Sequence, residues 1–516
     1  MNGAESLLRT LIANDVSVCF ANPGTSEMHF VAALDKVQGM RPVLGLFEGV
    51  VTGAADGYSR MLGKPACTLM HLGPGLANGV MNLHNARKAS SSIVNIIGDH
   101  ARYHKRYDTP LASDVESIAR PVSHWVHTSN SSQTIATDGA LAVQAARQAP
   151  GKIASLILPA DVSWEEAVVP AQAYPVPERA KVNPELVVKA AEHIRAGKRV
   201  VFLLRGDVLQ AEGLTLMQKI ATQGQVRIMA DTLYPRMRRG AGHVVVERIP
   251  YFPELALKSL AGTELLILVG AEPPVSFFAY PGVPNWLTPE NCQIFTLAHP
   301  HEDGVAALQG LCDELGASTA LIRLPTPQRI EISHDQPLNG LTIMQTVARH
   351  LPENAIICDE SISEGLPYND LLNAAAAHDF LNLAGGALGS MMAVAIGAAV
   401  ACPDRKIVNL QADGSAMYIL QALWTQAREM LNVTTVIYSN GGYQILRKEL
   451  ERTGATGENP LAESLFDIEN PSLNWVALAN GMGVRAISVR TPQAFEHAFV
   501  EAMHNRGPMV IECLIE

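Results

Sequence analysis

The sequence predicts an α/β protein with three doubly wound domains, each built around a parallel sheet. Short apolar runs alternate with segments of helical periodicity along the whole chain, a pattern typical of parallel strands covered by helices. The chain of 516 residues is too long for one hydrophobic core, and its 48% of hydrophobic residues is ample for buried strands. The strand-like runs lie at residues 16–21, 43–47, 66–70, 93–97, 154–158, 199–204, 265–269, 293–297, 355–358, 406–410, 434–438 and 509–514.

Two proline-bearing segments, residues 167–184 and 324–341, interrupt this alternation. Proline favours irregular backbone, and such segments commonly link domains. We therefore predict domains over residues 1–165, 185–325 and 340–516. No short repeat relates the three domains, although the outer two could share one fold.

The charge and the cysteine content exclude several classes of function. The net charge is −11 and no basic block is present, which argues against a nucleic-acid partner. The seven cysteines are scattered without a CxxC pair, which argues for reduced thiols, as in a cytoplasmic protein, and against a zinc site. The N-terminal residues lack the basic and apolar pattern of a secretion signal.

Residues 380–403 contain no charged side chain and are long enough to cross a bilayer. Asn382, Ser390 and four glycines interrupt this segment. We therefore predict a buried loop followed by a helix of small residues, and no membrane span.

An acidic and an amide side chain near the C-terminus have the spacing of a metal site. Asp413 lies in the run Ala-Asp-Gly-Ser, and Asn440 lies in the run Ser-Asn-Gly-Gly-Tyr, 440 − 413 = 27 positions later. A helix-length stretch and a strand-like run separate them, so two oxygen ligands would lie at the ends of one βαβ-like unit. Mg²⁺ prefers such ligands, and a helix starting near Gly414 would direct N–H groups at a diphosphate. The alternative is that both runs are ordinary turns.

A second candidate site lies in the first domain. Glu48 follows the strand-like run 43–47 and precedes a helical segment that ends at Arg60. A carboxylate between apolar neighbours loses hydration, which suits a group that accepts and donates protons. A surface glutamate at the end of a strand is the alternative.

Both segments resemble the motifs of thiamine diphosphate (ThDP)-dependent enzymes. The family pattern Gly-Asp-Gly, spacer, Asn-Asn is matched from Asp413 to Asn440, with Ala412 and Ser439 replacing its first Gly and its first Asn. Residues 48–60 are similar to the family's catalytic Glu and the helix that follows it. The likeness is greatest to benzoylformate decarboxylase and to acetolactate-synthase-like proteins. Further matches lie at residues 20–27, 71–78 and 384–389.

The resemblance implies a pyrimidine-binding domain, a central domain and a pyrophosphate-binding domain in that order. It implies catalytic roles for Glu48, which would hydrogen-bond the pyrimidine ring, for His71, a proton relay, and for Thr25, which would contact the substrate carboxylate. His71 could instead cap a glycine-rich loop. The implied Mg²⁺ ligands are Asp413, Asn440 and the carbonyl of Gly442.

The resemblance also implies a set of residues around the cofactor. Leu388 would support the bent form of ThDP, although it could equally be a plain core residue. The implied cofactor-binding residues are Asn78, Ser363, Gly386, Leu388, Gly414, Ser415 and Tyr443.

The implied activity is ThDP- and Mg²⁺-dependent, non-oxidative decarboxylation of a 2-keto acid to an aldehyde, with carboligation as an additional reaction. Phe277 and Phe278 would favour an aromatic or apolar substrate if they face the site. The alternative is an acetolactate synthase-type carboligase, although Gly49-Val50 stands where biosynthetic synthases have Gln-Gly.

Other classes of protein fit less well. A regulatory protein that lost turnover would not need to keep Glu48, Asp413 and Asn440 together. A nicotinamide dehydrogenase would need a GxGxxG turn after a strand, which we do not find. The central domain has no recognisable FAD or nucleotide motif, so the sequence leaves such binding open. In the resembled family, Glu48 of one chain meets the Asp413 domain of another, which implies a homodimer or homotetramer.

Overall fold

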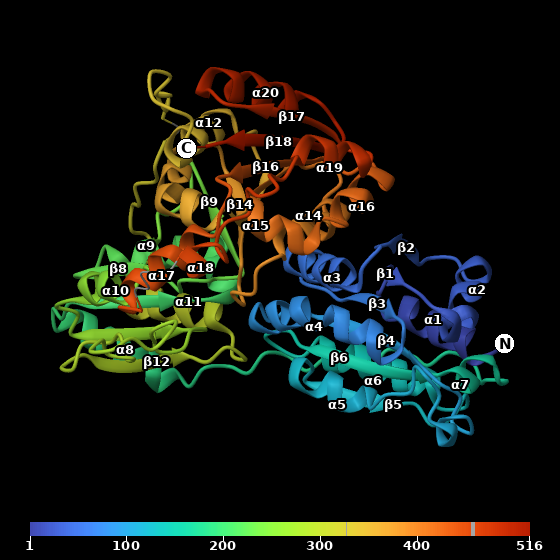
Figure 1. Ribbon diagram of the computed structural model, residues 1–516. Coiled ribbons are helices and arrows are strands. Elements are labelled where there is room, and N and C mark those ends of the chain that lie inside the picture. The colour runs from blue at the N-terminus through green and yellow to red at the C-terminus, as the bar shows by residue number, and fades with distance from the viewer. Residues whose placement is uncertain (327, 456–459, 516) are drawn as a thin grey trace.

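The protein is an α/β structure with three sheets, as the sequence predicts (Figure 1). The computed structural model describes residues 1–326, 328–455 and 460–515. In Figure 1 the N-terminal sheet is blue to cyan, the middle sheet is green to yellow, and the C-terminal sheet is mainly orange to red. Each sheet has its own set of helices packed around it.

The N-terminal sheet has six parallel strands in the order β2-β1-β3-β4-β6-β5. Strands at its centre are buried along their whole length, as expected where helices cover a parallel sheet. The strands are β1 (Val18–Asn22), β2 (Arg41–Leu44), β3 (Ala66–Met70), β4 (Ile93–Asp99), β5 (Trp125–Thr128) and β6 (Ile153–Pro159). The helices are α1 (Gly3–Ala13), η1 (Thr25–Glu27), α2 (Met28–Lys36), α3 (Glu48–Leu62), α4 (Leu72–Lys88), η2 (Lys105–Tyr107), α5 (Val115–Ala119), η3 (Arg120–Val122), α6 (Ile135–Ala146) and α7 (Ala160–Trp164).

The middle sheet has five parallel strands in the order β10-β8-β7-β11-β12. Its strands are β7 (Val200–Leu204), β8 (Val226–Ala230), β10 (Glu247–Arg248), β11 (Leu265–Val269) and β12 (Gln293–Ala298). Its helices are α8 (Pro184–Arg195), η4 (Gly206–Leu209), α9 (Ala211–Ala221), α10 (Pro253–Leu260) and α11 (Gly304–Glu314).

The C-terminal sheet has seven strands in the order β17-β18-β16-β15-β13-β14-β9. Six are parallel, and β9 (Arg236–Arg239), which comes from the middle of the chain, pairs antiparallel with β14 at the edge. The other strands are β13 (Ile356–Glu360), β14 (His378–Asn382), β15 (Ile407–Ala412), β16 (Val433–Ser439), β17 (Arg485–Val489) and β18 (Met509–Leu514). The helices are α12 (Gly340–His350), α13 (Ile362–Gly365), η5 (Leu366–Ala374), α14 (Met391–Ala401), α15 (Asp413–Ala416), η6 (Met417–Ile419), α16 (Ala422–Arg428), α17 (Gln444–Arg452), α18 (Pro460–Glu463), α19 (Trp475–Gly481) and α20 (Pro492–His504).

The two outer sheets share one topology, apart from the added strand β9. When each is numbered from its own first strand, both have the order 2-1-3-4-6-5. The winding direction therefore reverses between β1 and β3 in one sheet, and between β13 and β15 in the other. Doubly wound sheets bind ligands beyond the carboxyl ends of the strands at this reversal. His71 follows β3 and Asp413 follows β15, so both predicted groups of site residues lie at such a position.

All twelve predicted strands are present, with ends within about three residues of those predicted. Six further strands, β5, β8, β9, β10, β14 and β17, lack a clear apolar signal. Four of these lie at sheet edges, where side chains stay partly exposed, and β8 and β14 contain charged residues. Strand pairing stabilises these segments without requiring an apolar sequence.

The two proline-bearing segments are irregular in the structure. Residues 165–183 contain no helix or strand, and neither do the described residues of 315–339, with residue 327 outside the described part. We propose three domains with boundaries near 1–165, 185–325 and 340–516. Strand β9 lies within the second range but joins the third sheet, because the edge of β14 offers it free backbone groups.

The uncharged segment 380–403 forms a loop and the buried helix α14, as predicted, although residues 385–388 of the loop are only half-buried. Among the described residues, no helix is long and apolar enough to cross a membrane. α14 packs against α3, and glycines allow their backbones to approach closely (Figure 1). A Cβ on Gly53 would lie 2.7 Å from the Cβ of Ala393, and a Cβ on Gly57 would overlap the carbonyl oxygen of Val394. The contact thus depends on small residues.

We expect Gly57→Ala to separate α3 from α14, because the added methyl group would meet a backbone carbonyl that cannot rotate away. The free energy of unfolding, measured with urea, should fall by about 3 kcal/mol. Gly481→Ala is the matched control, since nothing lies within 4 Å of its Cβ position. Equal stability of the two variants would contradict the packing described here.

Burial lowers the pKa of His378 to about 3, and its Nε2 has no hydrogen-bond partner among the described residues. An unfolded histidine titrates near pH 6.5, so below that pH the unfolded chain binds a proton that the folded chain excludes. Folding stability should therefore fall as the pH drops from about 6.5 towards 3. In His378→Phe this loss should shrink by up to about 1.4 kcal/mol per pH unit.

Urea unfolding at several pH values between about 6.5 and 4.5 measures this slope. The exposed His497→Phe serves as the control variant. Identical slopes in wild type and His378→Phe would show that the buried ring does not resist protonation.

Candidate active site

The first group of site residues surrounds Glu48, the first residue of α3. Glu48 is only 6% exposed, and its Oε2 accepts a hydrogen bond of 3.0 Å from the Nδ2 of Asn78 on α4. A Cβ on Gly75 would lie 2.8 Å from the other carboxylate oxygen, so Gly75 leaves room for this approach. The structure therefore brings Glu48 and Asn78 into direct contact.

His71 is the second member of this group and is held by a carboxylate that the sequence analysis did not assign. Its Nδ1 lies 2.8 Å from the Oε2 of the fully buried side chain of Glu27. A carboxylate accepts hydrogen bonds, so Nδ1 carries the proton, which leaves Nε2 of the neutral ring as an acceptor. Glu27 also accepts the N–H of Gly24 at 2.7 Å, and a Cβ on Gly24 would overlap the ring of His71.

Thr25 is exposed and directly follows Gly24, so it lies at the rim of the same group.

Glu27 stands in the segment 20–27 that carried the family likeness, but its contact with His71 spans 44 positions and leaves no local pattern. A Cβ on Gly98, near the end of β4, would overlap the Oε1 of Glu27, an atom without a hydrogen-bond partner among the described residues. The buried carboxylate therefore requires glycine at this position.

The second group lines one cleft at the carboxyl edge of the C-terminal sheet. This cleft contains seven of the predicted cofactor or metal residues: Ser363, Leu388, Gly414, Ser415, Asn440, Gly442 and Tyr443. Asp413 lies directly behind them and lines the adjoining cavity. Residues that are up to about eighty positions apart in the sequence are thus brought together around one space.

Asp413 is 2% exposed and is surrounded by backbone N–H donors. Its Oδ2 accepts from Asn440 and Gly441 at 3.0 and 2.8 Å, and its Oδ1 accepts from Gly414 at 2.7 Å. Burial raises the pKa of this carboxyl group, while the N–H donors oppose the rise. No Lys, Arg or His forms an ion pair with it among the described residues. A buried carboxylate without a cationic partner fits a bound metal ion.

The loop after β16 supplies the other predicted metal ligands. The Oδ1 of Asn440 accepts the N–H of Gly442 at 3.2 Å, and its Nδ2 lies 3.4 Å from Glu364. A Cβ on Gly414 would overlap the ring of Tyr443, so this ring packs directly against the backbone of Gly414. The predicted helix after Asp413 is short, since α15 has four residues and continues as the 3₁₀ turn η6.

Amide and carbonyl oxygens with one carboxylate form a hard, oxygen-only ligand set, which suits Mg²⁺ better than a transition metal. Within the described residues there is no cluster of three or more His, Cys, Asp and Glu that could hold a metal ion. Any metal at Asp413 would therefore take part of its shell from a diphosphate or water.

The loop 383–389, which contains Gly386 and Leu388, is fixed from two sides. Gly386 and Gly389 have φ angles of +77° and +85°, a region that favours glycine. From the N-terminal domain, Asn85 accepts the N–H of Ala387 at 3.1 Å and donates to its carbonyl at 2.8 Å. These contacts join residues about 300 positions apart, so no local sequence pattern predicts them.

On the other side, the buried carboxylate of Glu360 ends β13 and accepts the N–H groups of Gly389, Ser390 and Met391 at 2.5 to 3.0 Å. Burial raises the pKa of Glu360, against the effect of these bonds. Glu360 therefore anchors the end of the loop to the same sheet that carries Asp413.

Strained backbone marks both groups. Leu72, next to His71, and Ile362, between Ser361 and Ser363, have φ angles of +53° and +48°. Such angles are unfavourable for residues with a branched side chain, and strain of this kind clusters at functional sites.

An aromatic side chain of the middle part of the chain lies at Gly386. The Cζ of Phe277 would be 2.7 Å from a Cβ on Gly386, and its ring contacts Tyr251 and Phe278 at centroid distances of 5.0 and 5.1 Å. Phe277 therefore faces the loop of the predicted cofactor residues, whereas Phe278 packs on it and is more exposed. Of the two predicted aromatic residues, the structure brings only Phe277 to the loop.

Two sheets of the same topology, each with a group of polar residues beyond the carboxyl ends of its strands, fit a class of enzymes that bind a phosphate-bearing cofactor at such positions. The description "Thiamine pyrophosphate enzyme, N-terminal TPP binding domain" matches residues 1–120, and the corresponding C-terminal TPP binding domain matches residues 369–513. The chain therefore belongs to the thiamine pyrophosphate enzyme family.

Relatives of known sequence agree with this assignment. The chain is 46% identical to a Mycobacterium tuberculosis protein, IlvX, that is provisionally named an acetolactate synthase large subunit, over 100% of the chain and 99% of that protein. It is 27% identical to benzoylformate decarboxylase of Pseudomonas aeruginosa over 96% of each. It is also 23% identical to acetolactate synthase isozyme 1 large subunit of Escherichia coli, over 100% of the chain and 94% of that protein.

Solved structures share the fold. The ThDP-dependent 4-hydroxybenzoylformate decarboxylase of Rhodococcus jostii superposes with a TM-score of 0.85 at 24% identity, covering 100% of this chain and 99% of the other. Benzoylformate decarboxylase of Polynucleobacter necessarius superposes with a TM-score of 0.84 at 22% identity, covering 100% and 99%. At such identities the likeness establishes the fold.

Proposed function

We propose that this protein catalyses the non-oxidative decarboxylation of a 2-keto acid with an aromatic or apolar side chain, giving an aldehyde and carbon dioxide, with ThDP and Mg²⁺ as cofactors. The observation that carries the substrate class is the position of Phe277 against the Gly386 turn. An aromatic ring beside cofactor-binding residues provides an apolar wall for a substrate side chain. Similarity to benzoylformate decarboxylase over nearly the whole chain supports this proposal.

In this proposal Asp413, Asn440 and the carbonyl of Gly442 hold Mg²⁺. Bound ThDP supplies a nucleophilic carbon and an electron sink, which allow the substrate carboxylate to leave as carbon dioxide. The residues of this chain bind, orient and shield it. Gly414, Ser415, Tyr443 and Ser363 would surround the diphosphate, and Gly386 and Leu388 would support the rings.

Three residues of the first group would handle protons and substrate. Glu48, buried and oriented by Asn78, would hold a proton at the pyrimidine ring. The Nε2 of His71 would accept or return a proton near the substrate, because Glu27 fixes the ring through Nδ1. The hydroxyl of Thr25, at the rim, would contact the substrate carboxylate.

An acetolactate synthase-type carboligase is the second candidate. The observation that favours it is the 46% identity to IlvX. In that reaction two molecules of pyruvate give acetolactate and one carbon dioxide. Both candidates use the same cofactor residues. They differ in whether the substrate fragment left after the loss of carbon dioxide takes up a proton or joins a second keto acid.

We also propose that the protein acts in the cytoplasm as a homodimer or homotetramer. The support for assembly is apolar surface beside both groups: Leu46 is 47% exposed near Glu48, and Tyr418 is 52% exposed near Ser415. A second copy would cover these side chains and bring Glu48 of one chain to the Asp413 cleft of its partner. Seven free cysteines fit a reducing compartment.

We expect Asp413→Ala to weaken Mg²⁺-dependent binding of ThDP by more than about 100-fold, because the only carboxylate of the ligand set is removed. Isothermal titration of the apoprotein with ThDP, with and without Mg²⁺, measures this. Asp370→Ala, at a carboxylate that is 93% exposed, is the matched control. Binding of ThDP by Asp413→Ala at wild-type affinity would refute the metal assignment.

We expect the wild type to convert benzoylformate to benzaldehyde and carbon dioxide. Glu48→Gln should lower kcat by about 100- to 10,000-fold while ThDP still binds, because the amide cannot exchange the proton. Aldehyde, acyloin and acetolactate are quantified from benzoylformate and from pyruvate, with the exposed Glu290→Gln as control. Acetolactate from pyruvate, with no aldehyde from either acid, would favour the carboligase instead.

A further inference from the structure

Helix α17 directly follows the loop of the predicted metal ligands, yet no hydrophobic core fixes its position. It begins at Gln444, and none of its nine residues is buried. Gln444 and Ile445, at its start, line the cleft of the predicted cofactor residues. A helix without a buried apolar face needs other contacts to hold it in place, and α17 makes such contacts at its other end.

The last residue of α17, Arg452, lies over two aromatic rings from the middle part of the chain. Its Cζ is 4.4 Å from the ring centroid of Phe252 and 4.9 Å from that of Tyr280. Its Nη2 donates to the two carboxylate oxygens of Glu254 at 2.9 and 3.0 Å. Glu254 belongs to α10, which lies beside α17 (Figure 1). Stacking and pairing together depend on the planar guanidinium.

Glu449, one helical turn before Arg452, adds a second attachment. Its Oε2 accepts a hydrogen bond of 2.9 Å from the hydroxyl of Tyr280. Burial and this bond raise the pKa of Tyr280, so its hydroxyl stays protonated and donates. Ile445, Glu449 and Arg452 follow the spacing i, i+4, i+7, so they lie on one face of α17. The face that lines the cleft at its start is therefore the face that is attached at its end.

A row of aromatic rings continues from Arg452 to the loop of the predicted cofactor residues. Phe252 contacts Tyr251 at a centroid distance of 5.2 Å, and Tyr251 contacts Phe277 at 5.0 Å. Phe277 in turn reaches the Gly386 turn. Closely packed rings yield little, so the row fixes Phe277 relative to α17. These residues and the cleft belong to the same chain, so they act on one cofactor site.

We propose that Arg452 is a positioning residue that sets the width of the substrate side of the cleft, between Phe277 and Ile445. The inference rests on the proposed function and gives a reason for the preference for aromatic 2-keto acids. A narrow apolar slot contacts both faces of a planar ring, whereas the methyl group of pyruvate is too small to touch both walls. Arg452 follows Ile445 by seven positions, about 10 Å along the helix axis, so it acts through α17 and the aromatic row.

The test is Arg452→Gln, which removes the guanidinium. We expect the KM for benzoylformate to rise about tenfold with kcat within about threefold of wild type, because the slot widens while the catalytic groups stay in place. Pyruvate, tested as a substrate or as a competitive inhibitor, should bind about as well as to wild type. The dissociation constant of ThDP, measured by titration of the apoprotein with Mg²⁺ present, should stay within about twofold.

Two further variants complete the test. Lys448→Gln is the matched control, since it removes a positive charge from an exposed side chain of the same helix. It should behave as wild type. Tyr280→Phe removes only the hydroxyl that holds Glu449, and should raise the KM for benzoylformate by about threefold. This smaller change keeps the inference testable if Arg452→Gln does not fold.

An unchanged KM for benzoylformate in both variants would overturn the inference. Equal losses for benzoylformate and pyruvate would also overturn it, since they would leave Arg452 a purely structural role. Hydrogen exchange of the apoprotein tests the attachment without turnover. Arg452→Gln should speed amide exchange at residues 444–452 by about tenfold, and unchanged exchange would show that Arg452 does not hold the helix. If wild type converts no benzoylformate, the proposed function fails, whereas the exchange measurement still tests the attachment.

Discussion

The close contact between α3 and α14 is the constraint on which the arrangement of the site depends. Glu48 begins α3, and the loop 383–389 leads directly into α14. The packing of these helices therefore sets how the Glu48 group and the loop 383–389 of one chain lie relative to one another. Glycine at the points of contact lets the backbones meet without intervening side chains, and a contact of this kind is rigid because neither backbone can yield.

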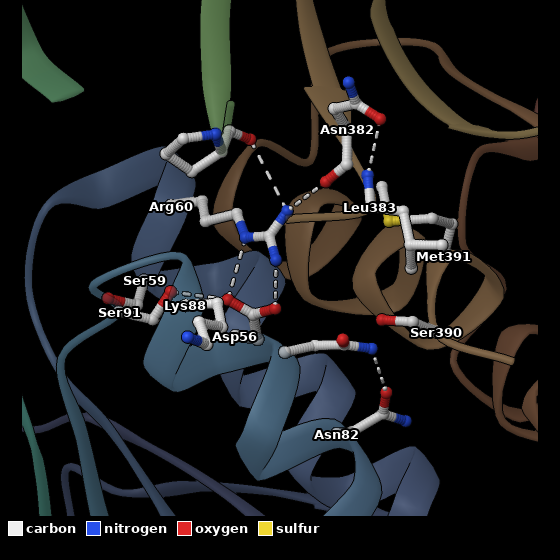
Figure 2. Close-up of polar contacts among 12 residues, drawn as sticks. Asp56, Ser59, Arg60, Asn82, Lys88, Ser91, Asn382, Leu383, Ser390 and Met391 are labelled. Carbon is white, nitrogen blue, oxygen red and sulfur yellow. Dashed lines mark hydrogen bonds and ion pairs between the residues drawn. The ribbon is translucent and has the colours of Figure 1, made fainter. Parts of the chain in front are cut away.

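Buried carboxylates divide into two kinds in this protein. Asp413 and Glu360 are surrounded by backbone N–H donors and have no cationic side chain as a partner among the described residues, so their charge is oriented but not neutralised. Asp56 is paired with the buried guanidinium of Arg60, which neutralises the charge of the carboxylate (Figure 2). Its oxygens are therefore not available to bind a ligand. The first kind suits ligand binding or the anchoring of a loop, and the second kind suits a structural contact between elements.

The twin topology of the outer sheets explains why the site has two groups. Each sheet reverses its winding once, and each reversal presents loops at the carboxyl ends of neighbouring strands. One reversal supplies His71 with Glu27, and the other supplies Asp413 with the Ser361–Ser363 turn. The two sheets share no obvious sequence repeat, because the topology requires only apolar strands and turns at matching places.

Apolar periodicity determined the class of fold and twelve of the strands, and the Asp413 to Asn440 spacing predicted a pair of oxygen ligands, since strand burial and this spacing are local properties of the chain. Contacts between remote positions were decided only by the tertiary structure. Arg60 meets Asn382 across 322 positions, Asn85 meets Ala387 across 302, and Glu27 meets His71 across 44. The same physical reason applies to β9, whose polar sequence forms a strand because β14 offers it an edge. A side chain whose partner is chosen by packing leaves no periodic or spacing signal, so only the folded chain can reveal it.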